Sequence, residues 1–144
     1  MGTILVATTN QHKIEEIRDI LAANGVSGWE LISLAEYPDY EAPEENGDTF
    51  AANAIIKAAA ACQASGLMAL SDDSGLSVDA LDGAPGVYSA RYAGEGHDDA
   101  ANRVKLLQAM ADVPEEQRTA RFVCAAALAF PGDLGNVNFW STEG

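Results

Sequence analysis

Short apolar runs alternate with amphipathic segments along the first half of the chain. Ile4–Ala7 and Trp29–Ile32 predict short buried strands. Between them, apolar residues recur at helical spacing, and Gly25 is expected to end the helix that they predict. The apolar positions of that helix are Ile14, Ile17, Ile20 and Leu21. The pattern predicts a strand, a polar loop, a helix and a second strand.

The middle of the chain contains an alanine-rich helix and an acidic segment. Asp48 or Thr49 is expected to cap a helix over Phe50–Ala64, which Ser65 and Gly66 would close. The apolar run Leu67–Leu70 then predicts a strand, and Ser71–Gly75 predicts a tight turn. The alternation in Leu76–Leu81 predicts a further strand.

The last third predicts one helix and a hairpin. Asp98 or Asp99 is expected to cap a helix that runs to Met110, with Val104, Leu107 and Ala111 on one face. Arg121–Phe130 and Val137–Trp140 flank a Pro-Gly-Asp-Leu-Gly turn and predict an antiparallel hairpin. The predicted fold is α/β, with a mixed sheet flanked by helices in a single domain over residues 1–144.

The net charge of −14 narrows the choice of partners. Eight Lys and Arg against 22 Asp and Glu argue against nucleic-acid binding, which depends on basic patches that neutralise phosphates. No apolar run reaches the roughly 20 residues that cross a bilayer. A small phosphorylated substrate stays possible if a metal, a few lysines and a helix N-terminus meet its charge. Cys62 and Cys124 are expected to be buried reduced thiols, which favours the cytoplasm.

The first candidate site is the polar loop Thr8–Lys13. It lies between a predicted strand and the first turn of a helix, where free backbone N–H groups and the helix dipole favour an anion. Lys13 adds a positive charge at the same place. A helix cap followed by a solvated lysine is an equally good interpretation of this segment.

The second candidate site joins Glu44 and Glu45 to the alanine-rich helix. That helix carries Asn53 and Lys57 four residues apart, and therefore on one face. Singly, the two acids fit ordinary surface charges. Lys57 is less ordinary, because its helix is otherwise almost entirely apolar and its charge needs a partner or a path to solvent.

The third candidate site is Asp72 and Asp73, followed by Ser74 and Gly75. Paired carboxylates at the end of a buried strand can hold a divalent cation at the rim of a sheet, which predicts a metal-dependent enzyme. The alternative is a plain surface turn. His12 and His97 lack the spacing of metal ligands.

These three segments resemble motifs of the inosine triphosphate pyrophosphatase family, which acts on non-standard purine nucleoside triphosphates. The match covers most of the chain from Thr3 to Phe139. Four stretches in the family's order carry it: Thr8–Lys13; Glu45–Phe50 with Asn53, Ala54, Lys57 and Ala58; Asp72–Leu76; and Gly83–Tyr92.

The resemblance implies hydrolysis of dITP, ITP or XTP to the monophosphate and pyrophosphate, by attack of water at the α-phosphorus. It implies that Lys57 and the loop residues bind the triphosphate, the latter being Thr8, Thr9, Asn10, Gln11, His12 and Lys13. It further implies that Glu45 and Asp73 bind Mg²⁺, that Asp73 is the general base, and that Ser74 contacts the substrate. The family also implies a homodimer.

The resemblance stops short at the C-terminus. A Gly-Phe-Gly-Tyr-Asp-Pro-like segment and a Ser-His-Arg segment, which form much of the family's purine pocket, do not occur in the 144 residues. We therefore expect a shortened form of the enzyme with a purine site open on one side. The alternative is an inactive fragment that still binds nucleotide and metal. The hairpin that ends at Trp140 is expected to leave an open, apolar edge that favours self-association.

Overall fold

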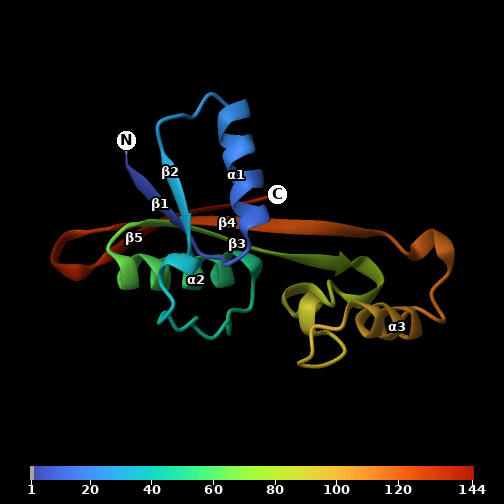
Figure 1. Ribbon diagram of the computed structural model, residues 1–144. Coiled ribbons are helices and arrows are strands. Elements are labelled where there is room, and N and C mark those ends of the chain that lie inside the picture. The colour runs from blue at the N-terminus through green and yellow to red at the C-terminus, as the bar shows by residue number, and fades with distance from the viewer. Residues whose placement is uncertain (1) are drawn as a thin grey trace.

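The computed structural model describes residues 2–144 and shows a five-stranded mixed sheet with a helix on each face (Figure 1). This confirms the predicted α/β class. The helices and strands are, in chain order, β1 (Thr3–Val6), α1 (Gln11–Ala23), β2 (Glu30–Ser33), α2 (Phe50–Ser65), β3 (Met68–Val78), α3 (Asp99–Ala109), β4 (Ala120–Pro131) and β5 (Val137–Glu143). Among these residues, no helix is long and apolar enough to span a membrane.

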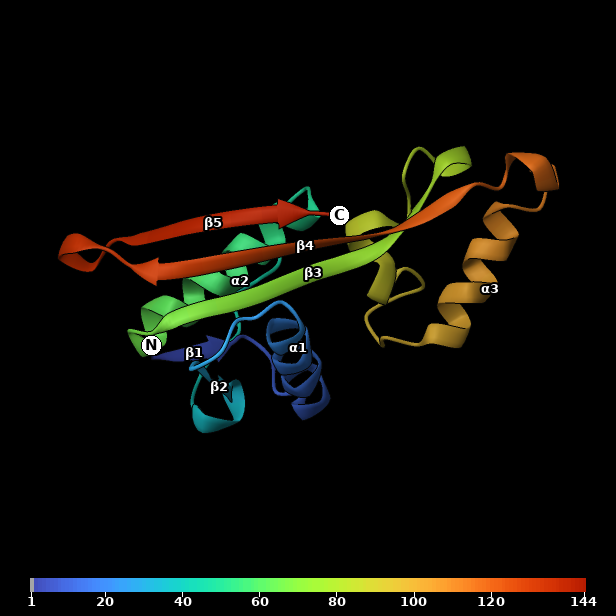
Figure 2. The same ribbon diagram turned by 90° about the horizontal axis from the view of Figure 1, so that it is seen from above.

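The sheet order is β2-β1-β3-β4-β5. Strand β1 pairs in parallel with β2 and β3, whereas β3–β4 and β4–β5 are antiparallel. Figure 2 shows that β3 and β4 run side by side well beyond the two central helices, toward α3. The predicted C-terminal hairpin is confirmed, because Pro131 pairs with Val137 next to the turn and Ala125 with Glu143 at its other end.

Helix α2 packs closely on one face of the sheet because both surfaces carry small side chains. Thr49 caps it by accepting a hydrogen bond from the Ala52 N–H, and Gly66 ends it in a left-handed conformation (φ 72°). The alanines of this interface are fully buried, and they are Ala54, Ala58 and Ala61 of α2 with Ala69, Ala125, Ala127 and Ala129 of the sheet. The alanine bias of the sequence is thus the packing surface of this layer.

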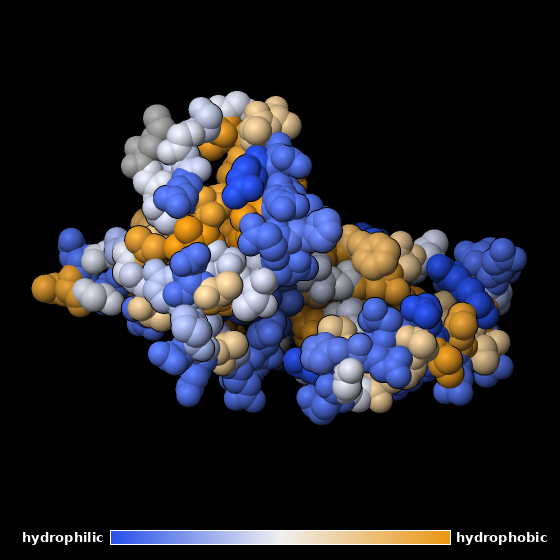
Figure 3. Space-filling model, viewed as in Figure 1, coloured by the Kyte–Doolittle hydropathy of each residue, from blue (hydrophilic) through white to orange (hydrophobic). Residues whose placement is uncertain are grey.

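Helix α1 covers the opposite face of the sheet with larger aliphatic side chains. Ile14 is 1% exposed and packs with buried residues of β1 and β2, namely Ile4, Val6 and Leu31. In Figure 3, hydrophobic side chains gather between α1 and the neighbouring strands, while the outer side of α1 is hydrophilic. Helix α1 covers only part of this face, so the α1 side of β3 and β4 is partly open.

The apolar face predicted for α3 is exposed to solvent. Val104 and Leu107 are 55% and 61% exposed, and no α3 residue is buried. Helix α3 lies against the 3-10 helix Gly86–Arg91 rather than against the sheet, and polar groups make the contacts there. The Asn102 side chain bonds the backbone of Ala90 and Ala93, and the Lys105 ammonium donates to the Tyr92 carbonyl.

The acidic segment is the interior of a strand and not the predicted turn. Strand β3 continues from Met68 to Val78, and its residues from Ser71 to Gly75 pair with Ala127 to Val123 of β4. The antiparallel partner satisfies the backbone of this polar stretch, so no turn is needed. Because side chains alternate along a strand, Asp72 and Asp73 point to opposite faces of the sheet.

Candidate active site

Lys57 lies between two carboxylates on the α2 side of the sheet. Its ammonium nitrogen is 3.4 Å from Glu45 Oε1 and 3.8 Å from Asp73 Oδ1. The three side chains come from the loop before α2, from α2 itself and from β3. The side chains of Lys57 and Asp73 are only 23% and 16% exposed. The partner that the sequence required for Lys57 is therefore a pair of acids from two other segments.

Asp73 carries an oxygen without a protein partner. Its Oδ2 atom is buried and accepts no hydrogen bond. Burial raises the pKa of Asp73 above its ordinary value, while the positive charge of Lys57 and the neighbouring Asn53 amide act in the opposite direction. A buried carboxylate oxygen with free lone pairs suits a cation or a proton donor of a substrate or water.

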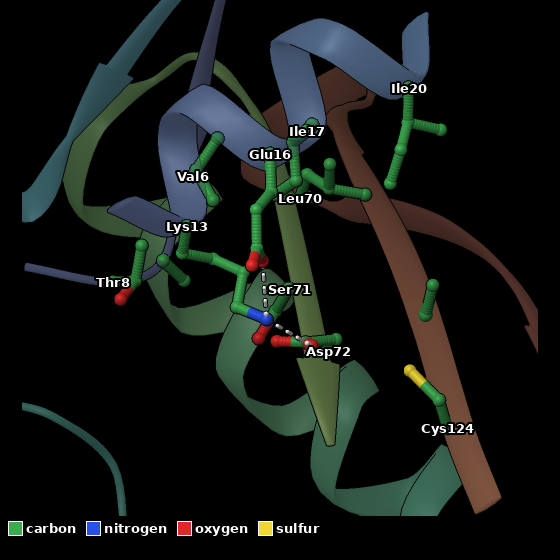
Figure 4. A pocket seen from close by; sticks show the side chains of 12 residues that line it. Val6, Thr8, Lys13, Glu16, Ile17, Ile20, Leu70, Ser71, Asp72 and Cys124 are labelled. Carbon is green, nitrogen blue, oxygen red and sulfur yellow. Dashed lines mark ion pairs between the residues drawn. The ribbon is translucent and has the colours of Figure 1, made fainter. Parts of the chain in front are cut away.

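Lys13 lies on the opposite side of β3. Its ammonium nitrogen is 3.9 Å from Asp72 Oδ2 and 3.3 Å from Glu16 Oε2. The negative charge of Asp72, followed by the interaction with Glu16, raises the pKa of Lys13 and keeps it protonated. Figure 4 shows the Lys13 side chain directed toward both acids.

A cavity of about 260 Å³ opens beside Lys13, between α1 and the sheet. Ile17, Ile20 and Leu70 form part of its apolar wall, and Asp72 lies at its polar end. Cys124 of β4 also lines this cavity and is exposed, so the prediction of two buried thiols is wrong for Cys124 and correct for Cys62 (Figure 4). The sequence could not reveal this, because the open face of β4 depends on where α1 ends.

The loop before α1 is a helix cap. The Asn10 side chain accepts a hydrogen bond from the His12 N–H, and the Thr8 hydroxyl accepts one from the Asn10 N–H. Thr9, Gln11 and His12 are exposed, with Gln11 as the first residue of the helix. The helix cap does not prevent the anion binding that the sequence predicted for this loop. The first turn of α1 leaves further N–H groups free for a ligand.

The structure brings the predicted residues together in two groups. Glu45, Lys57 and Asp73 share the α2 side of β3, whereas Lys13 contacts Asp72 on the α1 side. Ser74 is exposed and follows the alternation of Asp72. Within residues 2–144, no three His, Cys, Asp or Glu side chains form a ready metal cluster. Two pairs of carboxylates each flank a lysine, and the pair of Glu45 and Asp73 is the one that includes a buried oxygen without a partner.

Gly47 and Asn53 form a buried contact that the sequence interpretation missed. The Asn53 side chain is 1% exposed, and its Oδ1 atom accepts a hydrogen bond of 2.7 Å from the Gly47 N–H. The signal for it was present, because a polar residue on the same helix face as Lys57, among alanines, needs a partner as Lys57 does.

Two dITP/XTP pyrophosphatases from other bacteria match most of this chain. The dITP/XTP pyrophosphatase of Desulforamulus reducens is 48% identical over 141 residues, which cover 98% of this chain and 69% of the relative. The enzyme of the same name from Geobacter sulfurreducens is 52% identical over 132 residues, which cover 92% of this chain and 65% of the relative. The chain thus spans about two thirds of the length of these relatives.

Solved structures agree with the fold. The dITP/XTP pyrophosphatase from Mycobacterium abscessus superposes with a TM-score of 0.85 at 45% identity, over 99% of this chain and 69% of that one. The Staphylococcus aureus Ham1 protein gives a TM-score of 0.80 at 39% identity, over 98% and 69% of the two chains. The Ham1 family model matches residues 4–143. This chain therefore belongs to the Ham1 family, and the dITP/XTP pyrophosphatases described above are its relatives.

Proposed function

We propose that this chain is a magnesium-dependent pyrophosphatase that hydrolyses dITP, ITP or XTP to the monophosphate and pyrophosphate, and so removes non-standard nucleotides from the pool. One observation carries the proposal: Lys57 lies between Glu45 and Asp73, and the Asp73 Oδ2 atom is buried without a partner. The names of the relatives support the substrate class.

The residues present fit a magnesium ion. Glu45 and Asp73 offer carboxylate oxygens, which Mg²⁺ prefers, and both lie within 4 Å of the same ammonium nitrogen. The orphaned Asp73 Oδ2 lacks the partner that a cation would supply. When bound there, Mg²⁺ would neutralise phosphate charge and polarise the phosphorus–oxygen bonds.

The side chains of the chain have separable roles in this proposal. Lys13 and Lys57 bind phosphate oxygens through charge, and the free N–H groups of the Thr8–Lys13 loop add hydrogen bonds. Asp73 orients the attacking water and accepts its proton, because its buried carboxylate keeps one oxygen free of protein partners. Ser74, exposed on the same side of β3 as Asp72, contacts the substrate.

The alternative is a chain that binds nucleotide and metal without turnover. Pyrophosphate release from dITP, XTP and ATP, with and without magnesium, separates the two functions. Release from dITP and XTP but not ATP supports the enzyme, while nucleotide binding without release supports the alternative.

We further propose a homodimer in the cytoplasm. The support for association is the edge strand β5, whose Phe139 and Trp140 side chains are 56% and 61% exposed. The support for the compartment is that both cysteines are free thiols and Cys124 is exposed, which suits a reducing environment.

A further inference from the structure

The loop that carries Glu45 folds back over the first turn of α2. Thr49 caps this helix, and Asn53 lies in its second turn. The hydrogen bond from the Gly47 N–H to Asn53 Oδ1 therefore spans six residues and closes the loop onto the helix at 2.7 Å. Because Asn53 is 1% exposed, this bond is shielded from water and holds one fixed geometry.

Gly47 fits this place only because it has no side chain. A Cβ atom at position 47 would lie 2.7 Å from Asn53 Oδ1 and 2.8 Å from Ala52 Cβ. Both distances are shorter than any normal contact, so an added methyl group would push the loop away from α2. The short distance between the Gly47 backbone and the Asn53 amide therefore requires glycine at position 47 of the loop that carries Glu45.

Asn53 and Lys57 hold the loop at two points on the same face of α2, one turn apart. Lys57 contacts the Glu45 carboxylate directly, at 3.4 Å, and Asn53 fixes the backbone two residues further along. Lys57 also contacts Asp73. The Arg91 guanidinium adds a third contact, to the Glu45 carbonyl at 3.5 Å. The position of Glu45 relative to Asp73 therefore depends on both α2 side chains together with Arg91.

We propose that Asn53 is a positioning residue, which through the Gly47 N–H holds the Glu45 loop so that Glu45 and Asp73 can bind one cation. This inference rests on the proposed function, since it assigns the role of Asn53 to the proposed magnesium site. The burial of Asn53 excludes contact with substrate. Its effect is on metal affinity, and residues that orient metal ligands change that affinity by about 10- to 100-fold.

The first test uses Asn53→Leu and Asn53→Asp. Leucine has a similar size but no acceptor, so we expect the Gly47 amide to exchange its hydrogen about tenfold faster, the scale of one lost hydrogen bond. The magnesium concentration for half-saturation should rise by about tenfold or more. Aspartate keeps an oxygen acceptor for the Gly47 N–H, so Gly47 exchange should stay near the wild-type rate. Only exchange is compared for this variant, because its carboxylate replaces an amide that interacts with Asp73. Asn102→Asp is the matched control, because Asn102 Oδ1 also accepts a 2.7 Å bond, from the Ala93 N–H, and lies on α3 rather than on α2.

The second test approaches the same contact from the loop. Gly47→Ala leaves Asn53 in place. It should also speed hydrogen exchange of the amide at position 47, and it should raise the magnesium concentration for half-saturation about tenfold. Gly96→Ala is its control, because a Cβ at Gly96 meets no atom within 4 Å. Should Asn53→Leu fail to fold, this pair carries the test alone.

Three readouts separate the inference from the proposed function. Hydrogen exchange is measured in the metal-free protein, magnesium affinity by calorimetry without nucleotide, and pyrophosphate release at low and saturating magnesium. Recovery of turnover at saturating magnesium supports positioning, whereas an equal loss at all magnesium concentrations overturns it. Unchanged Gly47 exchange or unchanged magnesium affinity in both Asn53→Leu and Gly47→Ala would also overturn it. A wild-type protein that binds magnesium but releases no pyrophosphate refutes the proposed activity alone.

Discussion

Asp72 and Asp73 are neighbours in the sequence but lie on opposite faces of the sheet, each beside a different lysine. Asp72 Oδ2 is 3.9 Å from the Lys13 ammonium and Asp73 Oδ1 is 3.8 Å from that of Lys57. The alternation of side chains along β3 produces this division. The two acids are therefore not interchangeable.

Asp73→Asn is expected to lower pyrophosphate release from dITP by at least about a hundredfold. The substitution keeps the volume of the side chain but removes a charged oxygen that would bind the metal or accept the proton of water. Steady-state release of pyrophosphate in magnesium measures it. Near-normal turnover of the variant would remove Asp73 from the catalytic role.

The same substitution is expected to stabilise the metal-free protein at neutral pH. Burial raises the pKa of Asp73 in the folded state, so the unfolded chain releases that proton at lower pH than the folded one does. Ionisation of Asp73 therefore lowers the free energy of unfolding. This loss grows as pH rises from the ordinary pKa of an aspartate to the raised pKa of Asp73 in the folded protein. Thermal unfolding without magnesium should give a higher midpoint for Asp73→Asn at pH 7, and no advantage near pH 3. A lower midpoint at pH 7 would show that the lost Lys57 pair outweighs burial.

Lys13→Met and Lys57→Met are each expected to weaken binding of nucleoside triphosphates far more than binding of the free nucleoside, because both lysines act through charge. Calorimetric titration with dITP and with deoxyinosine measures the difference. Lys105→Met is a suitable control, since Lys105 lies on α3 and contacts the Tyr92 carbonyl and ring. Equal losses for both ligands would take the lysine out of the phosphate site.

Lys57→Met should also destabilise the metal-free protein more than Lys13→Met does. Lys57 is the more buried of the two, and its removal leaves Glu45 and Asp73 facing each other without a counter-charge. Lys13 and its partners are largely exposed, where an ion pair contributes about 0 to 1 kcal/mol. Urea denaturation of both variants without magnesium gives the comparison, and equal midpoints would contradict it.

Self-association is expected through the exposed edge of β5. Phe139 and Trp140 are more than half exposed, and an unpaired edge strand with apolar side chains tends to find a partner. Light scattering over a dilution series should show a concentration-dependent dimer. Tryptophan fluorescence at the same concentrations should report the burial of Trp140. Trp140→Lys should weaken it. A monomer at every concentration would show that this edge stays unpaired in solution.

Most of the secondary structure and the chemistry of the site follow from local patterns in the sequence. Thr49 and Gly66 mark the ends of α2, and the C-terminal hairpin follows from two apolar runs around a glycine-containing turn, because caps and turns act through local bonds. The motifs around Lys13, Glu45, Lys57 and Asp73 identified the family. A lysine among alanines required a charged partner whatever the fold.

Tertiary structure decided how these residues are divided and what they touch. Strand β4 pairs along the whole acidic segment, so this segment is a strand and Asp72 and Asp73 point to opposite faces of the sheet. The pairing partner lies some fifty residues away, and no local pattern in the sequence predicts it. Helix α3 has an exposed apolar stripe because polar contacts hold it to a neighbouring loop. The bond between Gly47 and Asn53 also depends on the path of the loop. Long-range pairing and side-chain burial are properties of the assembled chain, so a pattern along the sequence cannot fix them.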